Sequence, residues 1–125
     1  MSGERILLVE DDDDTRHLNR LILEMGGYTV LEAANGREAL RLAAAERPAL
    51  VLMDLNLPGM DGRETARRLR EAPETAALPV VALSGHSAEE IREQALREGF
   101  VAYLVKAMDP DGLAEEVGRI LTRLR

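Results

Sequence analysis

Three carboxylates, one hydroxyl and the only lysine of the chain stand just after short apolar runs of the sequence. These residues are Glu10, Asp11, Asp54, Ser84 and Lys106. If the apolar runs are parallel strands, their carboxyl ends bring the five side chains to one edge of a sheet. Clustered carboxylates repel one another unless a cation joins them, and Mg²⁺ prefers such oxygen ligands. The pattern indicates a magnesium site in which Asp54 is a metal ligand or a nucleophile that receives a phosphoryl group.

Lys106 and Ser84 complete this set, because an ammonium group and a hydroxyl can stabilise the oxygens of a phosphoryl group during transfer. Each residue alone also has a structural explanation, since Asp and Ser are common in caps and turns. An EF-hand calcium loop counted from Asp11 fails, because Arg16 and Ile22 stand where glycine and glutamate are required. The sequence also contains neither of the common glycine-rich phosphate loops.

Five apolar runs are the predicted strands that position these residues. Their starts lie 22, 21, 30 and 22 residues apart, and they span residues 6–9, 28–31, 49–53, 79–83 and 101–105. This spacing leaves room for one helix between successive strands, and continuous apolar runs are typical of parallel strands buried on both faces. The sequence therefore predicts an α/β fold with a doubly wound, five-stranded parallel sheet and five helices.

Apolar residues at helical spacing predict the first and the last helix. The first series precedes Gly26-Gly27 and comprises Leu18, Leu21, Ile22 and Met25. The last series comprises Leu113, Val117, Ile120, Leu121 and Leu124.

Start and stop signals predict the other three helices. Asn35 and Glu38 have the capping-box spacing that begins a helix, and Ser87 and Glu90 repeat it. Residues 62–71 have few apolar side chains but end before a proline, which terminates a helix.

Composition narrows the classes of function. A chain of 125 residues with 46% apolar and 31% charged residues fits one domain, and no apolar run approaches the roughly 18 residues of a membrane span. We therefore expect a single cytoplasmic domain over residues 1–125. The absence of cysteine excludes disulfides and thiolate-bound zinc. A net charge of −7 without a basic block argues against nucleic-acid and membrane partners. His17 is expected on a solvated helix and His86 in a loop.

Four motifs resemble the receiver domain of two-component response regulators. They are VEDD at 9–12, MDLNLPGMDG at 53–62, ALSG at 82–85 and YLVK at 103–106. The resemblance covers residues 6–121 and implies a chemotaxis-regulator-like, flavodoxin-like fold with strand order 2-1-3-4-5. It also implies that the chain receives phosphate from a histidine kinase or a histidine phosphotransfer protein.

The resemblance implies a role for each site residue. Asp54 is the phosphoacceptor. Mg²⁺ is bound by the side chains of Asp11 and Asp54, by the backbone carbonyl of Asn56, and by Glu10 through water. Enzymatic activity is not expected beyond phosphoryl acceptance and slow self-dephosphorylation.

The same resemblance implies a switch. Lys106 pairs with the phosphoryl group, Ser84 hydrogen-bonds it and moves inward, and Tyr103 changes rotamer to follow. The surface formed by the fourth helix, fifth strand and fifth helix then shifts between two states, and a downstream target binds there. Asn56 and His86 occupy the positions that tune the lifetime of the phosphate in this family.

Two alternatives stay open. Ala107 follows Lys106 where the family usually has a proline with a cis peptide bond, so the chain could be a pseudo-receiver that serves only as a scaffold. An aspartyl-phosphate phosphatase would use the same carboxylate chemistry, but such enzymes usually have a second aspartate where Asn56 stands.

Overall fold

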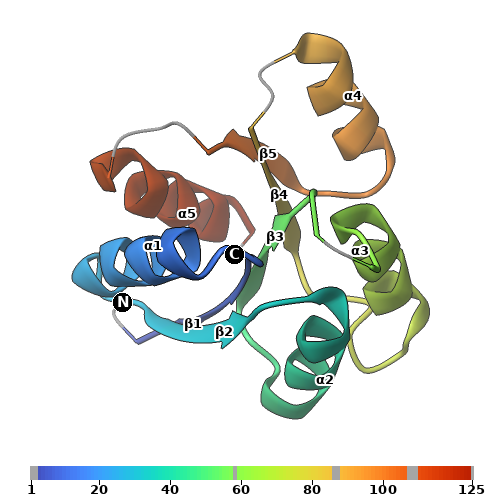
Figure 1. Cartoon of the computed structure of the whole chain (residues 1–125), viewed down its shortest axis with the longest axis horizontal. Helices are drawn as coiled ribbons and strands as arrows, with labels where there is room; N and C mark the ends of the chain where they lie inside the picture. Colours follow the sequence, from blue (N-terminus) through green and yellow to red (C-terminus); the bar gives the residue numbers. More distant parts are fainter. Residues whose placement is uncertain (1–2, 58, 86–87, 107–109, 125) are drawn as a thin grey trace.

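The predicted alternation of strands and helices is present in the computed structural model, which describes residues 3–57, 59–85, 88–106 and 110–124 (Figure 1). The strands are β1 (Arg5–Val9), β2 (Thr29–Ala33), β3 (Leu50–Asp54), β4 (Val80–Ser84) and β5 (Ala102–Val105). The helices are α1 (Asp13–Met25), α2 (Gly36–Glu46), α3 (Gly62–Glu71), α4 (Glu89–Arg97) and α5 (Pro110–Leu124). Each strand lies within two residues of its predicted position.

The five strands form one parallel sheet in the order β2-β1-β3-β4-β5, which confirms the expected fold class. Every residue of β3 and β4 is buried, because helices cover both faces of the sheet. The edge strands β2 and β5 are partly exposed. The apolar runs of the sequence therefore correspond to a sheet buried between two helical layers.

Helices α1 and α5 lie on one face of the sheet, whereas α2, α3 and α4 lie on the other (Figure 1). Along β1, Ile6 and Leu8 pack toward the first pair of helices, and Leu7 and Val9 pack toward the other three. The residues of α5 that are buried as predicted are Leu113, Val117, Ile120 and Leu121. Among the described residues, no helix is long and apolar enough to cross a membrane.

Helix α1 forms as predicted, but of its apolar series only Ile22 packs against the core. Leu18, Leu21 and Met25 are 58%, 46% and 87% exposed, and Leu23 is the buried residue of this helix. Arginines occupy part of the inward face, where they pair with a carboxylate of β2. Periodicity alone cannot identify the packing face when charged side chains satisfy one another on that face.

Short polar side chains begin three of the helices at the edge where the strands end. The side chains of Asp12, Asn35 and Asp61 accept hydrogen bonds from backbone amides in the first turns of α1, α2 and α3. The cap by Asn35 agrees with half of the expected capping box, but Glu38 accepts a hydrogen bond from the amide of Ala34 at 2.8 Å, one residue before the cap. Ser87, the expected cap of α4, lies outside the described residues, and α4 begins after Ala88 without a side-chain cap.

Gly62 allows the start of α3 to approach the end of β3 closely. Its amide donates to the carbonyl oxygen of Leu55 at 3.3 Å. A Cβ atom at this position would collide with the carbonyl oxygen of Asp54 and would lie 2.7 Å from the Cα of Leu55. Because the colliding atoms belong to the backbone, a larger residue has to displace the end of β3.

We therefore expect Gly62→Ala to lower the free energy of unfolding by about 2 kcal/mol, the usual scale of overpacking. Urea denaturation measures this change. Gly85→Ala is the matched control, because a Cβ there meets no atom within 4 Å. Equal losses in the two variants would contradict this explanation.

Candidate metal and phosphoryl site

The sheet brings the three predicted carboxylates together. Glu10 follows β1 and Asp54 ends β3, and these two strands are direct neighbours in the sheet. One oxygen each from Glu10, Asp11 and Asp54 lies within 4.8 Å of the others. Glu10 and Asp54 are each only 1% exposed, whereas Asp11 is exposed to solvent. The cluster therefore combines two buried carboxylates with one that is open to solvent.

Lys106 reaches this cluster from the end of β5. Its Nζ lies 3.0 Å from Oδ2 of Asp54 and 3.2 Å from Oε1 of Glu10. The backbone amide of Lys106 donates to the carbonyl of Ser84 at 2.8 Å and continues the pairing of β4 with β5 past the end of the strands. One ammonium group is thus shared by two buried carboxylates, and the pairing with Glu10 was not predicted from the sequence.

A turn after β3 orients the carboxylate of Asp54. The backbone amide of Asn56 donates to Oδ1 of Asp54 at 2.9 Å, which leaves Oδ2 toward Lys106. The residue Asn56 itself is exposed. The two oxygens of Asp54 therefore have different environments, with a backbone amide on one and the side-chain ammonium of Lys106 on the other.

Ser84 ends β4, the strand next to β3, and Tyr103 lies on β5, the edge strand beyond β4. Ser84 is 1% exposed and follows Leu83, which pairs with Asp54 in the sheet. Tyr103 is 9% exposed and packs in the core between the sheet and helices α2, α3 and α4. Their switch roles stay predictions.

Of the two histidines, only His17 is among the described residues, and it lies on α1 outside the carboxylate cluster. His17 is exposed on α1, as predicted, with its Nε2 atom 3.2 Å from Nη2 of Arg20. His86 and Ala107 lie outside the described residues, so the rate-tuning role of His86 and the geometry after Lys106 stay predictions.

Burial changes the acid–base properties of the cluster. The pKa of Glu10 is raised to about 7, mainly because the carboxyl group is buried. The nearby Asp54 contributes to this increase, whereas a hydrogen bond from the backbone amide of Asp12 opposes it. Burial also lowers the pKa of Lys106, but hydrogen bonds and charges from Asp54 and Glu10 outweigh this effect, so that its pKa is raised. When its three carboxylates are ionised, the site holds more negative charge than the ammonium of Lys106 can balance.

The donor atoms of the cluster fit a hard divalent cation. Oε1 of Glu10 and Oδ2 of Asp54 are buried, and within the described chain the ammonium of Lys106 is the one charged group that faces both of them. A cation with two positive charges would satisfy these oxygens and reduce their mutual repulsion. The exposed Asp11 leaves a side open for water, which Mg²⁺ usually retains.

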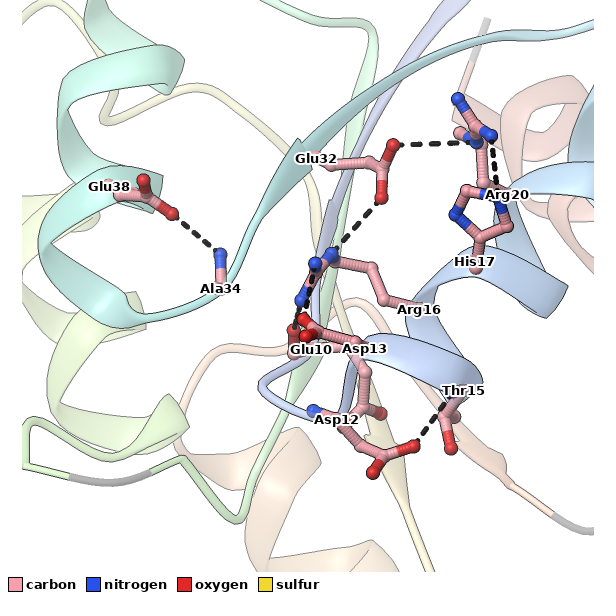
Figure 2. Close-up of polar contacts among 10 residues, drawn as sticks. All are labelled: Glu10, Asp12, Asp13, Thr15, Arg16, His17, Arg20, Glu32, Ala34 and Glu38. Atoms are coloured by element: carbon pink, nitrogen blue, oxygen red, sulfur yellow. Dashed lines mark hydrogen bonds and ion pairs between the residues drawn. The ribbon is translucent and has the colours of Figure 1, made fainter.

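Arg16 and Glu32 support this site and were not identified from the sequence. Arg16 of α1 contacts both Glu32 of β2 and the backbone of Glu10 (Figure 2). From the sequence, β2 was the one strand expected to supply no carboxylate, hydroxyl or lysine to the site. It supplies none to the carboxylate cluster, but Glu32 anchors Arg16 beside it. A glutamate within an otherwise apolar strand was the signal that could have revealed the pair.

Comparisons with known proteins agree with the fold and the motifs. The family model of the response regulator receiver domain matches residues 6–118. The uncharacterized 14.6 kDa protein in the sodA1 3′ region of Leptolyngbya boryana is 48% identical over 105 residues, which are 84% of this chain and 80% of that protein. Protein PilH of Pseudomonas aeruginosa is 34% identical over 117 residues, 94% of this chain and 97% of PilH.

Solved structures show the same architecture. The chemotaxis response regulator CheY4 of Vibrio cholerae superposes with a TM-score of 0.88 at 28% identity, covering 95% of this chain and 99% of that structure. The chain spans about half the length of the transcriptional regulatory proteins that it matches, 54% and 49% in two cases. The similarity therefore extends both to proteins of this size and to longer regulators.

The raised pKa of Glu10 predicts a pH-dependent stability in the absence of metal. Folded Glu10 keeps its proton up to about pH 7, whereas unfolded Glu10 loses it near its ordinary pKa of 4.5. The free energy of unfolding should therefore fall as the pH rises through this window, by an amount of the order of 3 kcal/mol. Urea denaturation of the wild type and of Glu10→Gln, which has no proton to lose there, isolates this contribution.

A divalent cation held at this cluster would disfavour protonation of Glu10, so added Mg²⁺ should stabilise the wild type more at about pH 8 than at about pH 6. A stability difference between wild type and Glu10→Gln that does not change with pH would refute this interpretation of Glu10.

Proposed function

This chain belongs to the family of response regulator receiver domains of two-component systems, and we propose that its Asp54 accepts a phosphoryl group from a phosphohistidine. The donor is a histidine kinase or a histidine phosphotransfer protein, which places the chain in the cytoplasm. The main support is the buried Asp54 carboxylate, which has Lys106 at 3.0 Å and two further carboxylates around it. Buried carboxylates this close together repel one another unless a cation joins them, so their charge favours a binding role.

The transfer forms an acyl phosphate on Asp54. A carboxylate oxygen of Asp54 attacks phosphorus, the P–N bond of the phosphohistidine breaks, and the departing imidazole nitrogen takes up a proton. The amide of Asn56 keeps one carboxylate oxygen in place, so that the reacting group does not rotate freely. Asp11 and Asp54 would hold Mg²⁺ through their side chains, Asn56 through its backbone carbonyl and Glu10 through water. The bound ion would neutralise charge on the transferring oxygens.

Lys106 and Ser84 bind the phosphoryl group after transfer. The raised pKa of Lys106 keeps its ammonium charged, and Nζ needs only a small movement from Oδ2 of Asp54 to a phosphoryl oxygen on the same carboxylate. Ser84 ends the strand next to β3, from which its hydroxyl donates a hydrogen bond to the phosphoryl group. Asn56, exposed two residues after Asp54, and His86 set the rate at which water removes the phosphate.

The signal reaches a downstream partner through α4, β5 and α5. Tyr103 of β5 follows Ser84 inward when the phosphoryl group is present. Helix α4 buries only Ala95 among its residues and has no side-chain cap at its start. A helix attached by so little buried surface can change position at low cost in free energy, which supports α4 as the element that moves. Phosphorylation shifts the equilibrium between two conformations of this surface because the phosphoryl group interacts more favourably with one of them.

Residues 1–125 act as one receiver domain. PilH, which is nearly the same length as the matched region, and the longer transcriptional regulators both contain such a region. The downstream partner is therefore another protein or a further domain, and the chain itself contacts neither nucleic acid nor membrane.

We expect Asp54→Asn to abolish labelling of the chain by phosphoramidate or acetyl phosphate in the presence of Mg²⁺, because the amide is a poor nucleophile. Mass spectrometry of the intact protein measures the gain of one phosphoryl group. Asp14→Asn is the control, since Asp14 is an exposed aspartate of α1 that is not part of the carboxylate cluster. It should be labelled like the wild type.

The same assay tests the two alternatives. A wild type that takes up no phosphate while remaining folded would support the pseudo-receiver scaffold. Continuous release of phosphate from a phosphate monoester, with loss in Asp54→Asn, would support the aspartyl-phosphate phosphatase. Labelling of Asp54→Asn at the wild-type level would place the phosphoacceptor elsewhere in the chain.

A further inference from the structure

Arg16 lies on the inward face of α1, beside the loop that joins β1 to α1. Its side chain is 17% exposed, unlike the solvent-facing Leu18 two positions further along the helix. The side chain extends from the helix toward β2 and the end of β1 (Figure 2). An arginine in this place displaces apolar packing, so its contacts must compensate for that loss.

The guanidinium group of Arg16 donates to three separate parts of the fold. Nε donates to Oε1 of Glu32 in β2 at 3.0 Å. Nη1 donates to the backbone carbonyl of Glu10 at 2.9 Å, and Nη2 donates to Oδ1 of Asp13 at 2.7 Å. One planar group therefore links the edge strand, the loop after β1 and the first turn of α1.

The carbonyl of Glu10 lies where the chain leaves the sheet and enters the β1–α1 loop. The amide of Glu10 still pairs with the carbonyl of Ala33 at 3.0 Å, which is the last ladder bond between β1 and β2. After it the chain leaves the sheet, and the Glu10 carbonyl bonds to Arg16 instead of to a strand. This carbonyl belongs to the peptide that joins Glu10 to Asp11, and both of these residues contribute to the carboxylate cluster.

We propose that Arg16 is a positioning residue for the metal site, because it holds the Glu10–Asp11 peptide against β2 and so fixes both carboxylates. This proposal rests on the proposed function, in which these carboxylates bind Mg²⁺. Arg16 acts through the backbone of Glu10 and touches neither the metal nor the phosphoryl group.

The charge of Arg16 does not compete with the metal. Its cation is paired with the carboxylates of Glu32 and Asp13, and the hydrogen bonds to these groups raise its pKa despite partial burial. The Glu10 carboxylate is free of it, since Oε1 of Glu10 faces Lys106 and Oε2 accepts from the amide of Asp12 at 3.2 Å. Arg16 thus orders the loop without occupying a metal ligand.

Only arginine can make this set of contacts. Its donors point in different directions within one rigid plane, whereas lysine has a single ammonium on a flexible chain. Lysine at position 16 keeps the positive charge but cannot bridge Glu32, Asp13 and the Glu10 carbonyl together. Arg16→Lys therefore separates the geometric contribution from that of charge.

Arg20 is a matched control on the same face of α1. Its Nε lies 3.4 Å from Oε2 of the same Glu32, and its Nη2 lies 3.2 Å from Nε2 of His17 (Figure 2). In the described contacts it makes no hydrogen bond to the β1–α1 loop. Arg20→Ala therefore removes an arginine and an ion pair to Glu32 while leaving the Glu10 carbonyl bond in place.

The test compares Mg²⁺ binding by the full chain in wild type, Arg16→Ala, Arg16→Lys and Arg20→Ala, measured by isothermal titration calorimetry. Loss of a residue that supports metal ligands weakens affinity by about tenfold or more, and we expect this in both Arg16 variants. Arg20→Ala should stay close to the wild type. Hydrogen exchange should become faster at the amides of residues 10–12 in the Arg16 variants alone.

Two outcomes would overturn the positioning role while leaving the proposed function intact. One is equal Mg²⁺ affinity in Arg16→Ala and Arg20→Ala, with the wild type labelled at Asp54. The other is wild-type affinity in Arg16→Lys, which would show that charge alone is sufficient. A wild type that binds no Mg²⁺ would refute the proposed function and this inference with it. If Arg16→Ala does not fold, Arg16→Lys supplies the comparison with Arg20→Ala.

Discussion

The candidate site depends on one lysine that is shared by buried carboxylates at the edge of the sheet. Lys106 pairs with both Asp54 and Glu10, and the third carboxylate, Asp11, lies beside them. Burying such charges is unfavourable unless each is paired, and here the negative charges outnumber the positive one. This excess of negative charge favours the binding of an additional cation. It also favours a ligand that can pair with the ammonium of Lys106 in place of a carboxylate.

The parallel sheet makes this cluster possible. In a sheet of order β2-β1-β3-β4-β5, the ends of β1, β3, β4 and β5 lie next to one another, and each supplies one part of the site. The surrounding contacts then limit how these ends can move. Gly62 lets α3 start directly against Asp54, and Arg16 holds the loop after β1 against β2. The functional groups are therefore attached to rigid elements on at least two sides.

Stability and function are divided between different parts of the molecule. The apolar core on both faces of the sheet provides the favourable free energy of folding, and the strands β3 and β4 are completely buried. The raised pKa of Glu10 means that this buried carboxylate disfavours folding of the metal-free chain as the pH approaches neutrality. Helix α4 buries only Ala95 and has no side-chain cap at its start, so the core and the helix start constrain it weakly. A domain built in this way can keep its sheet rigid while a peripheral helix changes position.

The sequence by itself determined the strands, most helix boundaries and the residues at the strand ends, because apolar runs, caps and turn residues act over a few neighbouring positions. The strand order came from the resemblance to a family, since local patterns do not encode which strands are neighbours. Tertiary structure alone decided that Lys106 pairs with Glu10 as well as Asp54, that Leu18 and Met25 face solvent, and that Arg16 meets Glu32. Each of these outcomes depends on contacts between elements that are distant in the chain, where register and packing determine which side chains meet.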